Sequence, residues 1–437
     1  MNILPIMAPA RWCSRLALAL LVVMPVMAAA QGLPQAKSPE EVGFSAERLK
    51  RLSEIFKAEI DKGTMPGAVL LVARRGKVAY FEALGVRDPQ SGDAMRTDAI
   101  FRLASMTKPF VSVATMMLME EGRLVLSDPV SRYLPEFKGL QVGVEQREAD
   151  GSVKFELEPV RREMMIQDLL RHTAGLTYGQ FGPKTLVKAA YDKAGLSSPE
   201  LTAPEFITRL SKLPLAHQPG STWDYSVATD VLGRVVEVVS GQDLETFIRE
   251  RISNPLGIRD AGFSVPPANH GRIAESFMNK ATGQRLVPRV VTVPPQRFGG
   301  GGGMVSSAAD YARFCQMLLN GGELDGMRLL SRQSVASMTS NHLPSSIRYT
   351  PHGTLLGASG PLPEMGQGWG LGFVVRTEAG KNPWPGSVGS YYWNGATGTG
   401  FWVDPKEQLI AVMMVQAPAQ QRLRALMRQA VYQAIID

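Results

Sequence analysis

A serine and a lysine stand three residues apart, at Ser105 and Lys108, immediately before a long apolar run. In a helix that begins at or just after Ser105, the two side chains share one face. A serine hydroxyl is a weak nucleophile until a neighbouring group takes its proton. A lysine amine can take it when burial and a positive potential, such as that of a helix N-terminus, favour the neutral amine. The spacing therefore fits a nucleophile beside its base, although an exposed helix start gives the same pattern.

Other hydrolytic chemistries lack their motifs in this chain. No G-x-S-x-G pentapeptide is present, which argues against the nucleophile elbow of the α/β-hydrolases. No H-E-x-x-H is present either, and the histidines do not have the spacing of metal ligands. These histidines are His172, His217, His270, His342 and His352. We therefore expect neither a metal centre nor a cofactor.

Two downstream segments complete a possible site. P-G-S-T-W-D-Y-S-V at 219–227 contains Tyr225, and a tyrosine beside an ammonium group can share its proton and act as base or relay. Y-W-N-G-A-T-G at 392–398 lies on a predicted strand, and its small residues permit close approach of the backbone to a ligand. A strand-edge N–H there can donate to an oxyanion, with the Ser105 N–H as second donor.

These three segments, in this order, resemble those of the serine hydrolases related to class C β-lactamases and penicillin-binding proteins. The resemblance is closest to the family VIII carboxylesterases and covers about residues 40–435. Three further segments carry it: G-R-L-V-L-S-D-P-V-S-R-Y-L-P at 122–135, L-L-R-H-T-A-G-L at 169–176 and G-G-G-M-V-S-S-A-A-D at 301–310.

The resemblance implies a role for each matching residue. Ser105 would be the nucleophile, Lys108 the base or its partner, and Tyr225 the tyrosine of the second motif. The family's H-T-x-G-L segment packs and caps, so His172 would be structural. The oxyanion hole would be formed by the N–H groups of Ser105 and Ala396.

The third motif is represented by Trp393, Asn394 and Gly395, which would contact substrate. Two positions depart from the pattern of β-lactamases and penicillin-binding proteins. Val227 stands where they carry an asparagine that bonds the substrate amide, and Trp393 stands where they carry a lysine or histidine beside the drug's carboxylate. Without that amide partner and that cation, the site loses charge-assisted hydrogen bonds to such substrates. Both departures favour an uncharged ester.

We expect the acyl pocket to be shaped by Tyr178, Phe181, Trp393 and the Gly/Pro-rich segment 343–368. The expected substrate is a small-molecule ester or amide. One alternative is a β-lactamase or D-alanyl-D-alanine carboxypeptidase on the same scaffold. Another is a non-catalytic binding module, against which the complete set of Ser105, Lys108 and Tyr225 argues.

The elements that position these residues follow from periodicity and turn signals. Ser45 can cap a helix whose apolar residues are Leu49, Leu52, Phe56 and Ile60. Two strand-like runs flank 74–77 and predict a hairpin. Residues 107–121 predict a helix in which methionines fill the core. These methionines, with the one just before the helix, are Met106, Met116, Met117 and Met119.

Residues 160–265 read as mostly helical, after an inserted hairpin at about 139–160. Segment 343–368 reads as a long loop, and the C-terminal part as alternating strands and turns, followed by a helix over 420–436. In these strands the runs are G-W-G-L-G-F-V-V, V-G-S-Y-Y-W-N-G, G-T-G-F-W-V-D-P and Q-L-I-A-V-M-M-V.

This order predicts an α+β fold of the β-lactamase/transpeptidase type. Its antiparallel sheet is formed by the N- and C-terminal segments, about 45–100 and 290–437. A mostly helical lobe is formed by about 101–289, and the site lies in the cleft between the lobes. Residues 31–437 are expected to form a single domain.

Residues 1–30 have the pattern of a secretory signal peptide: Arg11 and Arg15, an apolar run to Met27, and an A-x-A site at 28–30. Cleavage after about Ala30 predicts a secreted or periplasmic protein without stable membrane insertion. It leaves Cys315 as the single cysteine, so no internal disulfide is expected.

Cleavage also leaves 45 basic and 40 acidic residues, a net charge of +5 that is dispersed along the chain. This distribution argues against nucleic acid as a partner. The sequence does not indicate an oligomeric state.

Overall fold

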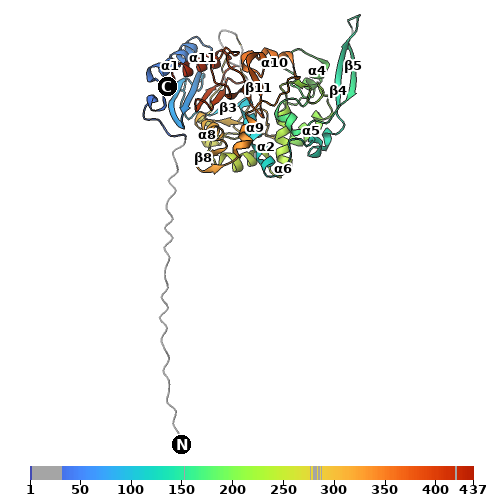
Figure 1. Ribbon diagram of the computed structural model, residues 1–437, viewed down its shortest axis with the longest axis horizontal. Helices are drawn as coiled ribbons and strands as arrows, with labels where there is room; N and C mark the ends of the chain where they lie inside the picture. Colours follow the sequence, from blue (N-terminus) through green and yellow to red (C-terminus); the bar gives the residue numbers. More distant parts are fainter. Residues whose placement is uncertain are drawn as a thin grey trace. The chain divides into compact units, whose positions relative to one another are not determined.

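In the computed structural model, the two ends of the described chain meet in one seven-stranded antiparallel sheet (Figure 1). The structure describes Met1 and residues 32–151, 153–275, 277–278, 283, 286, 288–418 and 421–437. The sheet order is β11-β12-β13-β14-β15-β1-β2. The strands are β1 Gly67–Arg74, β2 Lys77–Gly85, β11 Gln367–Trp369, β12 Val374–Arg376, β13 Tyr391–Asn394, β14 Gly400–Asp404 and β15 Leu409–Val415. This arrangement confirms the predicted α+β fold, in which N- and C-terminal segments share a sheet.

Strand β1 lies at the join between the two ends. It pairs with β15, Ala68 opposite Val415 and Arg74 opposite Leu409, and every residue of both strands is buried. Full burial means that both faces of the sheet are covered here. The covering helices include α1 (Ala46–Asp61) and α11 (Gln421–Tyr432), which lie side by side, and α8 (Ala308–Leu319), which packs on β1 and β15.

Local sequence signals account for these N-terminal elements. The Ser45 side chain accepts from the Arg48 N–H and caps α1, as predicted. The predicted hairpin between β1 and β2 is present. Its turn residues Arg75 and Gly76 have φ of 54° and 77°, the left-handed values that a two-residue hairpin turn requires.

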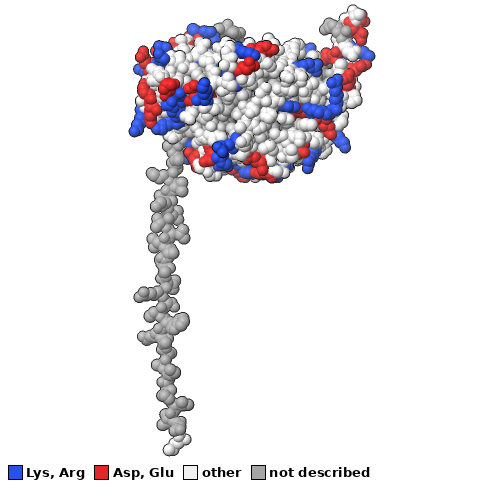
Figure 2. Space-filling view, viewed as in Figure 1, with Lys and Arg blue, Asp and Glu red and all other residues white. Residues whose placement is uncertain are grey.

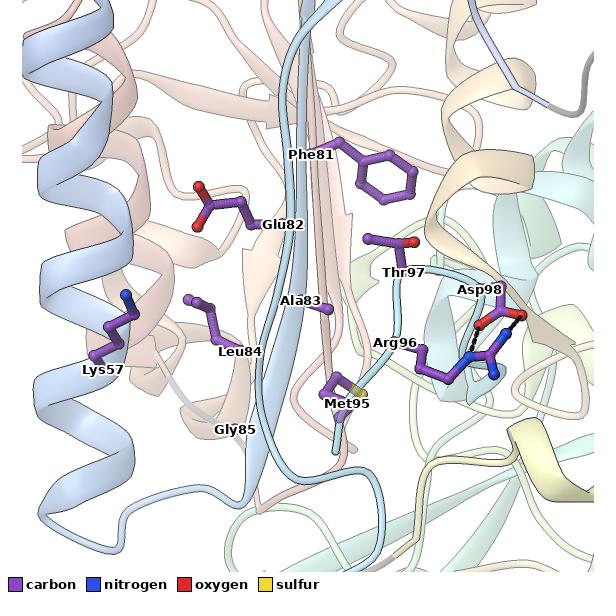
Figure 3. A pocket seen from close by; sticks show the side chains of 10 residues that line it. All are labelled: Lys57, Phe81, Glu82, Ala83, Leu84, Gly85, Met95, Arg96, Thr97 and Asp98. Atoms are coloured by element: carbon purple, nitrogen blue, oxygen red, sulfur yellow. Dashed lines mark hydrogen bonds and ion pairs between the residues drawn. The ribbon is translucent and has the colours of Figure 1, made fainter. Parts of the chain in front are cut away.

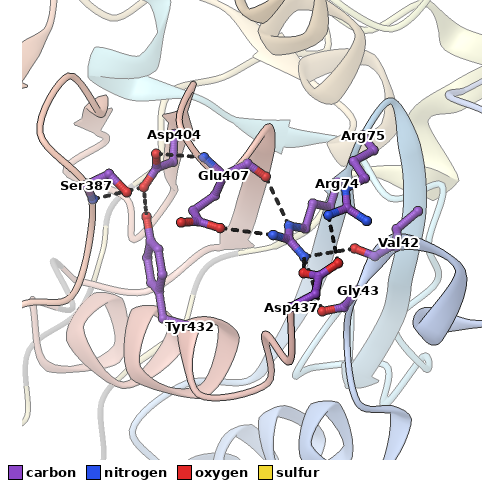
Figure 4. A network of polar contacts seen from close by, with 9 residues as sticks. All are labelled: Val42, Gly43, Arg74, Arg75, Ser387, Asp404, Glu407, Tyr432 and Asp437. Carbon is purple, nitrogen blue, oxygen red and sulfur yellow. Dashed lines mark hydrogen bonds and ion pairs between the residues drawn. The ribbon is translucent and has the colours of Figure 1, made fainter.

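A buried arginine fastens the sheet to the C-terminus (Figure 4). The Arg74 guanidinium donates to the carbonyl oxygens of Val42 and Glu407 and lies 2.5 Å from the Asp437 carboxylate. Nearby, Asp404 accepts from the Tyr432 hydroxyl at 2.6 Å. Strand β1, the turn after β14 and the end of the chain are therefore held in one polar network.

The helical part supports the segment that carries Ser105. Helix α2 (Lys108–Glu120) packs on α6 (Ala228–Ser240), which also contacts α3 (Ile166–Leu170). Met106, Met116 and Met117 are buried, which confirms that they fill the core. Further helices are α4 Leu186–Lys193, α5 Ala203–Leu210, α7 Leu244–Ile248, α9 Arg332–Met338 and α10 Pro351–Leu355.

The predicted insert is a hairpin of β4 (Gln141–Arg147) and β5 (Val153–Pro159) that projects from the body of the molecule (Figure 1). Short strand pairs make up the remaining sheets. They are β3 Phe101–Arg102 with β7 Val305–Ser306, β6 Thr222–Trp223 with β10 Arg348–Tyr349, and β8 Glu323–Leu324 with β9 Met327–Arg328.

Two C-terminal predictions were wrong in detail. The run G-W-G-L-G-F-V-V is two strands, β11 and β12, because the chain reverses between them at Gly372, whose φ is 110°. Segment 343–368 is not a plain loop, since it contains β10, α10 and the start of β11. The predicted terminal helix is present as α11.

Residues 31–437 form one compact unit. The predicted signal peptide lies outside the described residues, apart from Met1. Within the described residues, no helix is long and apolar enough to cross a membrane. Acidic and basic side chains alternate over the face shown in Figure 2, and Cys315 is a buried free thiol.

Candidate active site

Ser105 lies in a 3-10 turn, Ala104–Thr107, that leads directly into α2. Its hydroxyl oxygen is 3.4 Å from the Nζ of Lys108, the first residue of α2. Ser105 is half-buried, whereas Lys108 is buried. Ala104 has a φ of 47°, an unfavourable left-handed conformation for alanine, directly before the serine. The structure thus brings the two predicted residues together on a turn that holds backbone strain.

The Lys108 ammonium group is held by the glycine run at 299–303. Its Nζ donates to the Gly301 carbonyl at 2.7 Å, and the Gly301 N–H donates to Asp230 Oδ1 at 3.1 Å. A Cβ on Gly301 would lie 2.2 Å from Asp230 Oδ2, so only glycine fits there without rearrangement. Gly301 belongs to one of the segments that carry the resemblance but was assigned no role from the sequence, and Asp230 was not singled out. The glycine run was the available signal.

Tyr225 packs beside Lys108 and is bonded to the third motif. The Lys108 Nζ lies 4.6 Å from the centre of the Tyr225 ring. The Trp393 indole Nε1 donates to the Tyr225 hydroxyl oxygen at 3.2 Å. Both aromatic side chains are buried. The three predicted catalytic residues therefore share one site, and Trp393 contributes a hydrogen bond that the sequence did not indicate.

His172 lies behind Tyr225, with the two ring centroids 4.8 Å apart. Its Nδ1 accepts from the Ser226 N–H at 3.3 Å. Burial, together with the charge of Lys108, holds the pKa of His172 well below its usual value. A neutral imidazole that accepts from the backbone fits a structural role.

The two predicted oxyanion donors belong to segments that pack together. Strand β13 lies against the 104–107 turn. A Cβ on Gly395 would lie 2.3 Å from the Leu103 carbonyl oxygen, so glycine permits this close approach. The Thr399 hydroxyl donates to the same Leu103 oxygen at 3.0 Å. Ala396, the next residue in the third motif, is exposed.

The residues predicted to contact substrate lie on several elements of the fold. Tyr178 lies closer to the predicted catalytic residues than expected, because its hydroxyl is 3.4 Å from Lys108 Nζ. Burial, with the carboxylate of Asp230, raises the pKa of Tyr178 well above its usual value, so it remains a protonated phenol. Val227 is the buried N-cap residue of α6 and Asn394 ends β13.

Phe181 connects the site to segment 343–368. Its ring lies 5.2 Å from that of Tyr178 and stacks on His352 of α10, with centroids 4.7 Å apart and planes 8° apart. Segment 343–368 therefore contacts Phe181 directly, and Phe181 in turn contacts Tyr178.

A hollow of about 900 Å³ lies elsewhere, along the outer edge of β2 (Figure 3). Its lining includes Lys57, Glu82 and the Arg96–Asp98 ion pair, and none of the residues discussed above. In the described part of the chain, no group of three or more His, Cys, Asp or Glu side chains is placed to hold a metal ion.

The geometry places a serine hydroxyl beside a lysine and a tyrosine in one site. Residues 52–434 match the β-lactamase family. The chain belongs to that family. As a member that keeps Ser105, Lys108 and Tyr225 in one site, it is a serine hydrolase with a β-lactamase/transpeptidase-like fold.

Three individual proteins illustrate where it stands in the β-lactamase family. The chain is 36% identical over 364 residues to protein Rv1367c of Mycobacterium tuberculosis. The matched region covers 82% of this chain and 87% of that protein. It is 32% identical over 401 residues to esterase EstB of Burkholderia gladioli, with coverages of 86% and 92%. The solved structure of EstCE1, a hydrolase with promiscuous acyltransferase activity, superposes with a TM-score of 0.72 at 28% identity, covering 88% of this chain and 99% of that one.

Proposed function

We propose that the protein is an exported carboxylesterase that works through an acyl-enzyme on Ser105. The observation that carries the choice of an ester is Trp393, which fills the position of a carboxylate-binding cation and bonds to Tyr225. Val227, in place of an amide-binding asparagine, supports the same choice. The likeness to an esterase, EstB, adds support.

In the first half of the reaction, the Ser105 hydroxyl oxygen attacks the ester carbonyl carbon. Its proton passes to the Lys108/Tyr225 pair. The negative charge that develops on the carbonyl oxygen is stabilised by the N–H groups of Ser105 and Ala396. The carbon–oxygen bond to the alcohol then breaks, and the pair returns the proton to the departing alcohol.

In the second half, water attacks the acyl carbon of the ester formed on Ser105. The same pair takes a proton from this water, and the same N–H groups stabilise the oxyanion. The bond between the acyl carbon and the Ser105 oxygen then breaks, and the pair returns the proton to that oxygen, which restores the hydroxyl and releases the carboxylic acid. The Gly301 carbonyl accepts from the Lys108 Nζ at 2.7 Å and so holds the amino group of Lys108 beside Tyr225.

The acyl pocket is assigned to Tyr178, Phe181 and Trp393 with segment 343–368, in keeping with the stacking of Phe181 on His352. The substrate is a small-molecule ester with an apolar acyl group. The signal-peptide pattern of residues 1–30 supports export to the periplasm or the outside of the cell. Residues 31–437 would then act as a single catalytic domain.

The test compares the purified protein with its Ser105→Ala variant on p-nitrophenyl acetate, butyrate and octanoate, and on the β-lactam nitrocefin. Rapid ester cleavage that depends on Ser105, with little nitrocefin turnover, is expected. Fast nitrocefin turnover with poor ester cleavage would instead favour the β-lactamase alternative. Full esterase activity in Ser105→Ala would exclude Ser105 as nucleophile.

A further inference from the structure

One buried arginine of α11 bonds directly to the peptide group that carries the second oxyanion donor. The Arg424 Nη2 donates to the Gly395 carbonyl oxygen at 2.7 Å and to the Thr399 carbonyl oxygen at 3.1 Å. The Gly395 carbonyl and the Ala396 N–H are the two ends of a single planar peptide group. A contact with one end therefore fixes the orientation of the other.

The direction of that N–H follows from the geometry of the peptide. No cis peptide bond is present in the described residues, so the carbonyl and N–H of this unit point in opposite directions. The carbonyl points to Arg424 on α11, and the Ala396 N–H therefore points away from α11. Ala396 is exposed, while Gly395 on its other side is buried against Leu103, two residues before Ser105.

Two further hydrogen bonds hold the turn at 395–399 against the residues just before Ser105. The Thr397 hydroxyl donates to the Arg102 carbonyl at 2.8 Å, and the Thr399 hydroxyl donates to the Leu103 carbonyl at 3.0 Å. These bonds fix where the turn lies relative to Ser105. The Gly398 N–H also donates to the Gly395 carbonyl oxygen, at 3.2 Å, so the turn's own backbone and the shorter, charged contact from Arg424 together hold the plane of the peptide between Gly395 and Ala396.

Arg424 makes this contact as a buried side chain, and removing a charged guanidinium from water costs desolvation energy. It is 8% exposed, and its Nε has no hydrogen-bond partner within the described residues. There it bonds to main-chain carbonyls and forms no ion pair with a carboxylate. Burial lowers the pKa of Arg424 to about 10, so it still carries its charge at neutral pH. A charged donor on a carbonyl polarises the whole peptide and strengthens its N–H as a donor.

A second buried arginine, one turn further along α11, provides a contrast. Arg428 is 3% exposed and lies over the rings of Tyr392 and Trp402, at 4.4 and 4.8 Å from their centres. It has the same charge and the same helix as Arg424 but no hydrogen bond to the Gly395 carbonyl. The effect of burying an arginine on α11 can therefore be separated from the effect of bonding the Gly395–Ala396 peptide.

We propose that Arg424 is a positioning residue for catalysis, which orients and polarises the Gly395–Ala396 peptide so that the Ala396 N–H donates to the oxyanion. The inference rests on the proposed esterase mechanism, since it assigns the second oxyanion donor to Ala396. Arg424 lies outside the three motifs. It contacts the carbonyl end of this peptide, whereas the oxyanion would contact the N–H end.

The test uses the full chain with Arg424→Met, Arg424→Lys and, as matched control, Arg428→Met. Each is assayed for kcat and KM on p-nitrophenyl butyrate, for inhibition by a trifluoromethyl ketone that forms a tetrahedral oxyanion, and for Tm. Loss of a complete oxyanion donor costs about 10²–10³ in kcat. Loss of its positioning in Arg424→Met is expected to cost about 10- to 100-fold in kcat and in inhibitor affinity, with KM changed by less than about threefold.

Arg424→Lys keeps a charged donor and is expected to recover about threefold or more of the lost kcat. Arg428→Met is expected to lower Tm while kcat stays within about twofold of wild type. The inference is overturned if Arg424→Met keeps kcat and inhibitor affinity, or if Arg428→Met loses as much of both.

Failure of the proposed function gives a different result. In that case the wild-type protein lacks ester cleavage that depends on Ser105, and the assignment of Arg424 falls with it. If wild type cleaves esters through Ser105 but Arg424→Met is unimpaired, the esterase mechanism stands and the role of Arg424 alone is rejected.

Discussion

The indole Nε1 of Trp393 lies 3.2 Å from the hydroxyl oxygen of Tyr225 and donates a hydrogen bond to it. The tryptophan therefore does more than replace a cation by apolar surface. It holds the phenol oxygen in place from the third motif, while Lys108 lies over the ring from the first. An indole N–H also stabilises a phenolate better than it stabilises a phenol, because hydrogen bonds to charged groups are stronger.

Trp393→Phe is expected to reduce kcat/KM for a short ester by about 10-fold, since a hydrogen bond to a charged group contributes about 1.5–3 kcal/mol. The change keeps an aromatic ring and removes the donor. Steady-state kinetics on p-nitrophenyl butyrate measures the effect. Trp402→Phe is the matched control, because its Nε1 has no partner within the described residues. Equal losses in the two variants would contradict a specific role for the Trp393 N–H.

Tyr225 and Tyr178 both lie near Lys108 but are expected to respond differently to loss of the hydroxyl. Tyr225→Phe should lower kcat by about 10²–10⁴, the usual contribution of a general base. Tyr178→Phe should lower it by less than about 10-fold, because burial keeps that phenol protonated and unable to accept a proton. Rates of covalent labelling of Ser105 by a fluorophosphonate, followed by intact mass, should show the same order. A larger loss for Tyr178→Phe would reverse the assignment.

The elements that sequence could predict are those set by local patterns. The cap at Ser45 and the turn at Arg75 and Gly76 were correctly predicted, because their signals lie within a few residues of the structure they form. The reversal at Gly372 was missed, because an apolar run with alternating glycines reads equally well as one strand or two. The close approach of Gly372 to α2 also lies outside any local pattern, since a Cβ there would lie 2.4 Å from the hydroxyl oxygen of Ser112, 260 positions away in sequence.

In the candidate active site, too, local contacts were predicted and contacts between distant residues were not. Ser105 and Lys108 are three residues apart, so helical geometry alone brings them together. The contact of Lys108 with Gly301 joins residues 193 positions apart, and no periodicity predicts it. The family resemblance supplied Tyr225 and Trp393 as motif positions, but not the hydrogen bond between them, which depends on side-chain orientation.

Gly301→Ala should impair catalysis through Lys108, because the added Cβ would lie 2.2 Å from Asp230 Oδ2 and displace the carbonyl that holds the ammonium group. We expect kcat to fall by at least about 10-fold, on the scale of a misplaced general base. Gly302→Ala is the matched control, since its Cβ would meet no atom closer than 3.5 Å. Kinetics and Tm of both variants distinguish the two positions. Normal kcat in Gly301→Ala would show that the Gly301 carbonyl does not position Lys108.

The buried, neutral His172 should make the folded state sensitive to acid. Its pKa in the folded protein is well below the ordinary value near 6.5, so below that pH the unfolded chain binds a proton that the folded chain does not. Stability from this group is therefore complete above pH 6.5. It is lost as the pH falls, with a slope that approaches about 1.4 kcal/mol per pH unit.

His172→Asn removes the titration and can retain an acceptor for the Ser226 N–H through its amide oxygen. Urea unfolding of both proteins from pH 5 to 7.5 measures the effect as a difference. Burial raises the pKa of Asp310 to about 6, which gives a pH dependence of opposite sign, but this contribution is common to both proteins and cancels. The stability of wild type relative to His172→Asn should decline steadily below pH 6.5. A difference that stays constant over this range would mean that His172 is protonated equally in the folded and unfolded chains.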